Sequence, residues 1–159
     1  MSDKLKFELI TPERVVYQDE VDQVTLPTMD GEITILPMHI PLVAQLVPGV
    51  AVLRKKGRDE DVAVSGGFIE VDKEGHVRVL ADTAERGMNL NLEDIEKAKQ
   101  RAEDVMRSAA RGDDEAFAHA AAEMEREMAR YKVAVKYHQH AKTSGLATGG
   151  DLTDDAGPV

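Results

Sequence analysis

Cysteine and tryptophan are absent from the 159 residues, and aromatic residues make up 4% of them. Without cysteine there is no disulfide framework, no thiolate nucleophile and no sulfur ligand for a metal. The chain also lacks a run approaching the roughly 18 consecutive apolar residues that a membrane span requires. The opening residues MSDKLKFELI have neither an apolar signal core nor an Arg-rich transit pattern. We therefore expect a cytosolic chain or one peripheral to a membrane.

Acidic residues outnumber basic ones by 30 to 20, which gives a formal net charge of -10. Nucleic-acid binding draws much of its free energy from Lys and Arg side chains that neutralise phosphates, so a nucleic-acid partner is not expected. Residues 1–90 carry 16 acids and 10 bases, residues 91–142 carry 11 and 10, and residues 143–159 carry 3 and none. The charge thus divides the chain into three segments with net charges of -6, -1 and -3.

Residues 1–90 have the pattern of a β-sandwich. Leu5, Phe7 and Leu9 alternate with Lys6 and Glu8, which is the period of a half-buried strand. Short strands at close spacing, without long helical patterns between them, indicate an antiparallel sandwich rather than a parallel sheet. Further strand-like runs are Val21–Leu26, Glu32–Leu36, Gly49–Arg54, Val62–Ser65, Phe68–Asp72 and Val77–Leu80, and turns are expected at Met29–Gly31, Lys56–Asp59 and Asp72–Gly75.

Residues 91–142 predict an antiparallel helical hairpin. Apolar residues step by three and four, Asn91 is suited to cap the first helix, and Asp113 or Asp114 is suited to cap the second after Gly112. A connection this short forces the helices to run antiparallel. The expected seam consists of Ile95, Ala98, Ala102, Val105 and Ala109 from the first helix, and Phe117, Ala121, Met124, Met128, Tyr131 and Val135 from the second.

An alanine-rich seam buries little area, so the hairpin needs another surface to pack on and could undock. Residues 143–159 hold four glycines, a proline and three acids, with little to bury. Such a composition predicts a disordered acidic tail.

No catalytic or metal-binding motif is apparent. The Ser65–Gly67 stretch lies between strands rather than before a helix, so it reads as a tight turn and not as a phosphate loop. Ser65 and His39 have no nucleophile-elbow pattern to join them. His138 and His140 are two residues apart, which on a helix directs their imidazoles about 200° from each other. We expect no catalytic residue, no metal site and no cofactor.

The second helix ends in a basic stretch. Between residues 126 and 142 there are five bases and one acid, Glu127, which gives a local charge of +4 in an acidic chain. Two interpretations stay open. Cations near a helix C-terminus complement the helix dipole, and they could equally bind an acidic protein partner.

The segment from Pro37 to Pro41 places His39 between two prolines. Because neither proline donates a ladder hydrogen bond, this piece is expected at an edge or in a crossing loop. A rigid loop that displays Met38, His39 and Ile40 suits a contact surface better than proton transfer. Docking is the first interpretation, and a structural histidine with satisfied hydrogen bonds is the second.

Three stretches, GEITILPMHIPLVAQLVPGV, SGGFIEV and VLADTAER, directly precede the predicted helical hairpin. In this order and spacing they resemble the epsilon-subunit family of the rotary ATP synthase, called delta in mitochondria. The resemblance covers residues 4–142. It implies a ten-stranded antiparallel β-sandwich over residues 1–90, followed by a two-helix antiparallel coiled coil over residues 91–142 and a tail over residues 143–159.

The resemblance also implies a non-catalytic central-stalk subunit of a proton-translocating ATP synthase. Its partners would be the gamma subunit and the membrane rotor ring of c subunits, at the cytoplasmic face of the plasma membrane, and the isolated chain would be a monomer. The Met29–Glu32 loop and the Pro37–Pro41 loop would share the sandwich end that meets the ring. Expected rotor-ring or stalk contacts are Asp30, Gly31, Glu32, His39 and Pro41.

By the same resemblance, the hairpin would rest on the sandwich or extend toward the catalytic head, where it would meet acidic segments of the beta subunit and inhibit ATP hydrolysis. The expected contacts in that state are Arg126, Arg130, Lys132 and Lys136.

Some members of the family bind ATP through an Ile/Leu-Asp-x-x-Arg-Ala motif at the start of the hairpin. Here Asn91 replaces the Asp and Asp94 replaces the Arg, and a carboxylate repels phosphate. Two alternatives are kept beside the stalk subunit: a nucleotide-sensing switch, and an adaptor that uses its hairpin to oligomerise.

Overall fold

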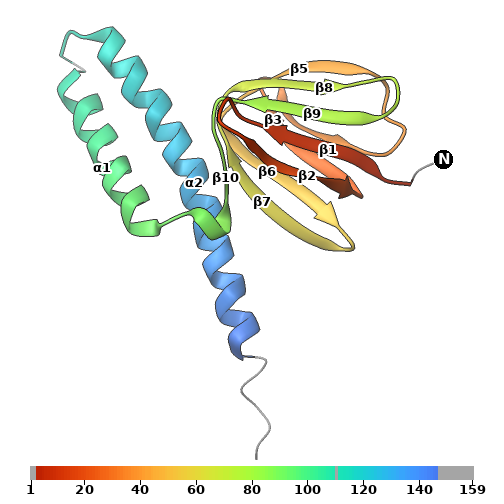
Figure 1. Cartoon of the computed structure of the whole chain (residues 1–159). Coiled ribbons are helices and arrows are strands. Elements are labelled where there is room, and N and C mark those ends of the chain that lie inside the picture. Colours follow the sequence, from red (N-terminus) through yellow and green to blue (C-terminus); the bar gives the residue numbers. More distant parts are fainter. Residues whose placement is uncertain (1–2, 110, 147–159) are drawn as a thin grey trace, which may run out of the picture.

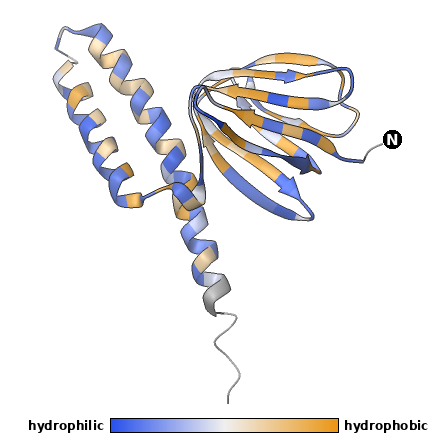
Figure 2. Cartoon of the chain, viewed as in Figure 1, coloured by the Kyte–Doolittle hydropathy of each residue, from blue (hydrophilic) through white to orange (hydrophobic). Residues whose placement is uncertain are grey.

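The computed structural model describes residues 3–109 and 111–146, and it contains a strand-rich body followed by two helices (Figure 1). Hydrophobic and hydrophilic residues alternate along many of the strands, as Figure 2 shows. The ten strands are β1 (Leu5–Ile10), β2 (Val15–Val21), β3 (Gln23–Thr28), β4 (Gly31–Ile35), β5 (Leu42–Leu46), β6 (Gly49–Lys55), β7 (Arg58–Val64), β8 (Gly67–Val71), β9 (His76–Ala81) and β10 (Ala84–Arg86).

The strands form two layers that meet at a single pairing. One layer has the order β10-β7-β6-β3 with β4 beside β3, and the other has the order β5-β8-β9-β1-β2. Thr28 of β3 pairs with Leu46 of β5 and joins the layers at one edge. The predicted ten-stranded sandwich is confirmed. One pair departs from the antiparallel expectation, because β1 runs parallel to β9.

The sandwich core comes from the inward-facing positions of both layers. Phe7, Leu9, Val24, Leu26 and Ile69 are each no more than 1% exposed. Fully burying side chains of this kind contributes about 1.5–3 kcal/mol each, so this cluster is the main source of stability in residues 5–86. The sandwich is thus a rigid body on which surface residues hold fixed positions.

The helices begin where their capping residues predict. After a 3-10 turn η1 (Gly87–Asn89), α1 (Leu92–Ala109) starts behind Asn91, whose side-chain oxygen accepts a hydrogen bond from the Glu93 amide at 2.9 Å. The second helix, α2 (Asp114–Leu146), is capped by Asp113, which accepts from the Ala116 amide at 2.9 Å. Asp113, and not Asp114, is therefore the cap.

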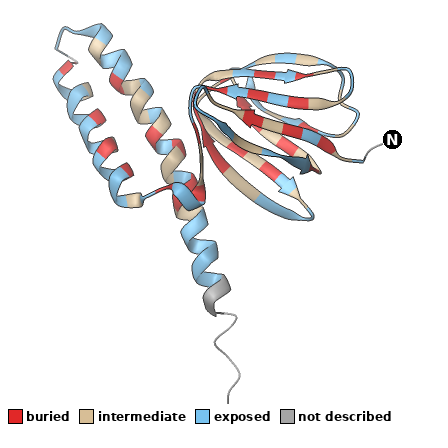
Figure 3. Cartoon of the chain, in the orientation of Figure 1, coloured by how far each residue is buried: buried red, intermediate tan, exposed pale blue. Residues whose placement is uncertain are grey.

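The predicted seam is right for α1 and displaced for α2. Of its α1 members, four are buried and Val105 is 45% exposed (Figure 3). On α2, Phe117 and Met128 are 40% and 46% exposed. The buried α2 positions lie mostly one residue earlier in the chain: Ala120, Glu127, Ala129, Val133 and Ala134. The apolar pattern predicted the wrong face of α2 because Glu127 is buried, although its charge predicts exposure to solvent.

α2 lies between α1 and the sandwich (Figure 1). A second apolar cluster joins Ala63 of β7 and Leu90 to Ile95, Val133 and Ala134 of the hairpin. α2 continues to Leu146, past the predicted hairpin end at Lys142, and residues 147–159 of the expected tail lie outside the described residues. Neither helix, within the part of the chain that the structure describes, has the length and apolar content needed to cross a membrane.

Candidate interaction surfaces

The β3–β4 turn displays two acids at one end of β4. Asp30 and Glu32 are exposed, and so is Met29, at 71%. The Thr28 hydroxyl donates to the Gly31 carbonyl at 2.5 Å, which closes the turn. The turn is therefore fixed in place while its side chains point to solvent.

The Pro37–Pro41 loop is a tight turn that presents apolar side chains more than its histidine. The His39 amide donates to the Leu36 carbonyl at 3.1 Å, and Met38 has a φ of 65°, a costly backbone state for a non-glycine residue. Met38 and Ile40 are 74% and 75% exposed. The half-buried His39 uses Nδ1 to donate to the Ile40 carbonyl at 2.7 Å. The histidine thus contributes to the loop fold, and Met38 is held outward.

These two loops lie at opposite ends of β4, which corrects the expectation that they share one end of the sandwich. In the β3–β4 pairing, Thr28 faces Gly31 next to the turn, whereas Val24 faces Ile35 at the far end. Four residue steps of about 3.4 Å separate the ends by about 14 Å. The expectation treated neighbours in the sequence as neighbours in space, although a strand between two loops holds them apart.

An apolar row on the outer face of the second layer was missed by the sequence reasoning. Phe68 pairs with Leu80, Leu80 with Ile10 and Ile10 with Val15, so the row crosses β8, β9, β1 and β2. Phe68, Leu80 and Val15 are 59%, 49% and 53% exposed. The signal was available as doublets such as Phe68-Ile69, because a strand that is apolar at consecutive positions carries apolar groups on both faces.

A polar ladder runs beside this apolar row. Arg78 contacts Glu70 at 3.4 Å and Glu8 at 3.5 Å, and Gln18 donates to Glu8 at 2.7 Å. The face therefore combines an apolar strip with a charged border. This composition is typical of protein–protein contact surfaces, which have an apolar centre and a polar rim.

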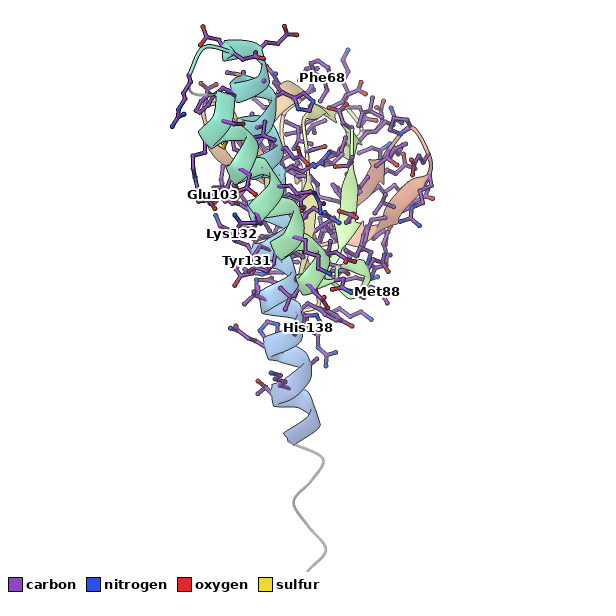
Figure 4. The ribbon with its side chains drawn as sticks, turned by 90° about the vertical axis from the view of Figure 1, so that its left-hand side faces the viewer. Phe68, Met88, Glu103, Tyr131, Lys132 and His138 are labelled. Carbon is purple, nitrogen blue, oxygen red and sulfur yellow. The ribbon has the colours of Figure 1, made fainter. Side chains whose placement is uncertain are left out.

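The four predicted basic contacts of α2 do not share one environment. Arg130 and Lys136 face the sandwich and form ion pairs, whereas Lys132 is exposed on the side of α2 seen in Figure 4. Arg126 lies between these extremes, 41% exposed and 3.6 Å from Glu127. Half of the predicted basic surface is therefore covered by this chain's own acids.

Arg130 bridges the sandwich and the interior of α2. Its Nε is 2.5 Å from Glu85 of β10, and its Nη1 is 2.7 Å from Glu127, which is 1% exposed. Burial of the Arg130 guanidinium lowers its pKa, but hydrogen bonds and charge from Glu85 and Glu127 outweigh burial and raise the pKa. Arg130 therefore stays charged and is neutralised from two sides.

Two further contacts fix α2 to the sandwich below Arg130. Lys136 Nζ lies 2.8 and 2.7 Å from the two carboxylate oxygens of Asp61 on β7. At Gly87, an added Cβ would come within 2.8 Å of the Tyr137 Cβ, so the helix approaches the backbone of η1 as closely as a glycine permits. The docked hairpin is thus held by close packing at Gly87 as well as by ion pairs.

A polar groove lies between the upper half of α2 and the sandwich. Two cavities of about 320 and 470 Å³ share Asp82, Thr83 and Arg126. Acids and arginines both line it, so it has no single charge sign that would select one ligand.

Ser65 and His39, the two residues that a nucleophilic site would have to combine, do not lie together. Ser65 accepts from the Thr83 amide and hydroxyl, both at 2.8 Å, near the end of β7, and β5 separates this region from the His39 loop. His138 and His140 are exposed near the end of α2. Within residues 3–109 and 111–146, no group of three His, Asp or Glu side chains is placed to hold a metal ion.

The altered nucleotide motif has a structural role in this chain. Asn91 caps α1, Asp94 is exposed, and Arg130 of α2 is bound by Glu85 and Glu127.

Comparison with known proteins identifies the family. Residues 4–87 match the family described as "ATP synthase, Delta/Epsilon chain, beta-sandwich domain". The chain is 47% identical over 102 residues to the ATP synthase epsilon chain of Carboxydothermus hydrogenoformans, covering 64% of this chain and 75% of that one. It is 44% identical over 131 residues to the epsilon chain of Moorella thermoacetica, covering 82% and 96%.

A solved structure has the same fold across both parts of the chain. A chain of the Euglena gracilis mitochondrial ATP synthase, solved as an OSCP/F1/c-ring assembly, superposes with a TM-score of 0.71 at 22% identity and covers 88% of this chain and 84% of that one. The sandwich, the hairpin and the matched sequences agree, and this chain belongs to the family of ATP synthase delta/epsilon chains.

Proposed function

We propose that this chain is the non-catalytic epsilon subunit in the central stalk of a proton-translocating ATP synthase, that its sandwich binds the gamma subunit and the c ring, and that its hairpin restrains ATP hydrolysis. The observation that carries the proposal is the match to the Moorella thermoacetica epsilon chain, which spans 96% of that protein. Such coverage includes the hairpin as well as the sandwich.

The sandwich offers separate surfaces for separate partners. The apolar row of Phe68, Leu80, Ile10 and Val15 suits the gamma subunit, because it is continuous over four strands and bordered by charges. Since the two loops lie at opposite ends of β4, which are about 14 Å apart, we assign the Asp30–Glu32 turn and the His39–Pro41 loop to different contacts, one with the c ring and the other with the stalk.

The hairpin would inhibit hydrolysis when it extends toward the beta subunit. Arg126 and Lys132 are accessible in the docked state, whereas Arg130 and Lys136 must first leave Glu85 and Asp61. An acidic partner segment can replace those two carboxylates, so docking and extension exclude each other. Moving such an equilibrium from 1:99 to 99:1 takes ~5.5 kcal/mol of differential binding.

We place this subunit at the cytoplasmic face of the plasma membrane, attached to the rotor ring and peripheral to the bilayer. The chain needs no cofactor for this role.

A pull-down with the gamma subunit tests the sandwich surface. We expect Phe68→Ser and Leu80→Ser together to weaken gamma binding by at least about tenfold, since each removes an exposed apolar side chain from the centre of the row. Phe117→Ser, which removes a 40% exposed side chain from the hairpin, is the matched control and should leave binding unchanged. Equal binding by all variants would place the contact elsewhere.

ATP hydrolysis by the reconstituted complex tests the hairpin. A chain that ends after Asn91 should still assemble but give faster hydrolysis than the full chain, because the basic helix is missing. Replacing all four bases by Gln should have the same effect if charge holds the extended state. The replaced residues are Arg126, Arg130, Lys132 and Lys136. Unchanged hydrolysis in both would show that this hairpin does not inhibit.

A further inference from the structure

Glu127 is a buried carboxylate at a position where the rest of the helix buries alanine. It lies seven residues after Ala120 and seven before Ala134, both of which are buried. Burying a charge is costly unless it is paired, and an apolar side chain would fill such a position without that cost. The glutamate is therefore unexplained by packing of the hairpin.

The guanidinium of Arg130 is divided between two carboxylates. Nε and Nη2 lie 2.5 and 3.2 Å from Glu85 on the sandwich, while Nη1 lies 3.0 and 2.7 Å from the two oxygens of Glu127. Because the guanidinium is planar, the bond to Glu127 sets the direction in which the Nε edge faces Glu85. Glu127 thus positions Arg130 for docking.

A second arginine stands beside the same carboxylate. Arg126 Nε is 3.6 Å from Glu127 Oε1, one helical turn before Arg130, and its side chain is 41% exposed at the polar groove. If Arg130 turns toward another carboxylate, Arg126 remains within reach of Glu127. The buried charge of Glu127 then stays neutralised by a residue of the same helix.

We propose that Glu85, Arg130, Glu127 and Arg126 form a charge latch in which Glu127 aims Arg130 at the sandwich and Arg126 takes over as the partner of Glu127 when the hairpin undocks. This inference rests on the proposed movement of the hairpin and deepens its regulation. Undocking then exposes Glu85 to water and leaves no buried charge on α2 without a partner. The latch can therefore open without unfolding the hairpin.

Spin labels measure the latch in the isolated full-length chain. Because the chain has no cysteine, labels can be attached at Lys73→Cys in the β8–β9 turn and Ser108→Cys on α1, both exposed positions. Pulsed dipolar spectroscopy then reports the distance between the sandwich and the hairpin. With the native latch we expect one dominant distance.

Glu85→Gln and Glu127→Gln should each raise the population at a second distance by about tenfold, the change expected for losing a hydrogen bond to a charged group. Glu127→Leu should raise it as well while helicity is kept, although leucine fills the buried position. Glu93→Gln is the matched control, since it breaks the exposed Lys97–Glu93 pair on α1, and it should leave the distances unchanged.

A docked hairpin in Glu127→Leu would overturn the latch, because the carboxylate would then serve packing alone. Arg126→Gln should keep the docked distance but, when combined with Glu85→Gln, should lower the melting temperature of the hairpin, and additive effects of the two changes would overturn the role of Arg126. The proposed function fails separately: it is refuted if variants with an undocked hairpin hydrolyse ATP at the same rate as the native complex.

Discussion

At the scale of single residues, Gly67 has the closest contact for an added Cβ among the glycines that the structure describes. A Cβ there would lie 1.9 Å from the Leu80 carbonyl oxygen, and its φ of 153° is one that other residues rarely adopt. The β8–β9 pairing cannot accept this clash without separating the strands. Gly67→Ala should therefore lower the free energy of unfolding by about 2–4 kcal/mol, measured by urea denaturation.

The neighbouring glycine provides the control. A Cβ on Gly66 would meet the end of the Asp82 side chain at 3.3 Å, and that side chain can move. Gly66→Ala should cost less than about 1 kcal/mol. Similar losses of unfolding free energy at both positions would mean that the clash with the Leu80 carbonyl is not the cause of the loss at Gly67.

Residue-scale prediction succeeded for helix caps and failed for Glu127. Asn91 and Asp113 cap the helices because capping depends on a short polar side chain beside the first amides, which the sequence displays locally. The burial of Glu127 depends on Arg130 and Glu85, and Glu85 is 42 positions away in the chain. Nothing local to the glutamate distinguishes it from the exposed acids of α2.

At the scale of elements, α1 is tied to α2 by more than its alanines. The Lys99 ammonium of α1 lies 4.3 Å from the centre of the Tyr131 ring of α2. Such a contact contributes about 0.5–1 kcal/mol at an exposed site. Lys99→Ala should lower the hairpin's stability by that amount, seen as earlier loss of helical circular dichroism on heating.

Lys97→Ala is the comparison for this prediction. Lys97 pairs with Glu93 on the exposed side of the same helix, a contact that contributes about 0.3–0.5 kcal/mol. A larger loss from Lys97→Ala than from Lys99→Ala would show that the Lys97–Glu93 pair, and not the contact with Tyr131, contributes more to the stability of α1.

Strands were predictable where an inner face alternates with a polar outer face, as in β1 and β9. β2 (Val15–Val21), β5 (Leu42–Leu46) and β10 (Ala84–Arg86) were not singled out. β5 follows Pro41 and carries an exposed Val43, which hides its period, and β10 is three residues long. Their pairings with β8 and β7 define them, and such long-range pairings are not visible in a local pattern.

At the scale of the whole molecule, acid should weaken the sandwich through carboxylates held by lysines. The hydrogen bond from Lys55 is the largest cause that lowers the pKa of Asp19, and that from Lys4 is the largest for Asp22. Their folded pKa values thus lie below the ordinary value of 3.8. These groups stabilise the fold above pH 3.8 and lose this contribution as pH falls through the folded pKa.

Urea denaturation at a series of pH values checks this. We expect these two groups to leave the free energy of unfolding level between pH 7 and pH 5 and to reduce it below about pH 4. Asp22→Asn should make the decline shallower. A decline with the same slope in the variant would assign the acid sensitivity to other carboxylates.

The family was more accessible from the sequence than the interaction surfaces. Three stretches in order indicated the family, and the sandwich and hairpin are both confirmed. The Asp30–Glu32 and His39–Pro41 assignments stay predictions, and their separation required the course of β4. The apolar row from Phe68 to Val15 required four strands from distant parts of the chain to be aligned.

The position of β4 between two displayed loops has a mechanical meaning under the proposed function. A hydrogen-bonded strand resists stretching, so it keeps two attachment points at a constant spacing while the assembly turns. Adding one residue would also reverse which side chains face inward, whereas adding two would preserve the faces and lengthen the spacing by about 7 Å. The length of β4 therefore sets the distance between the two partners.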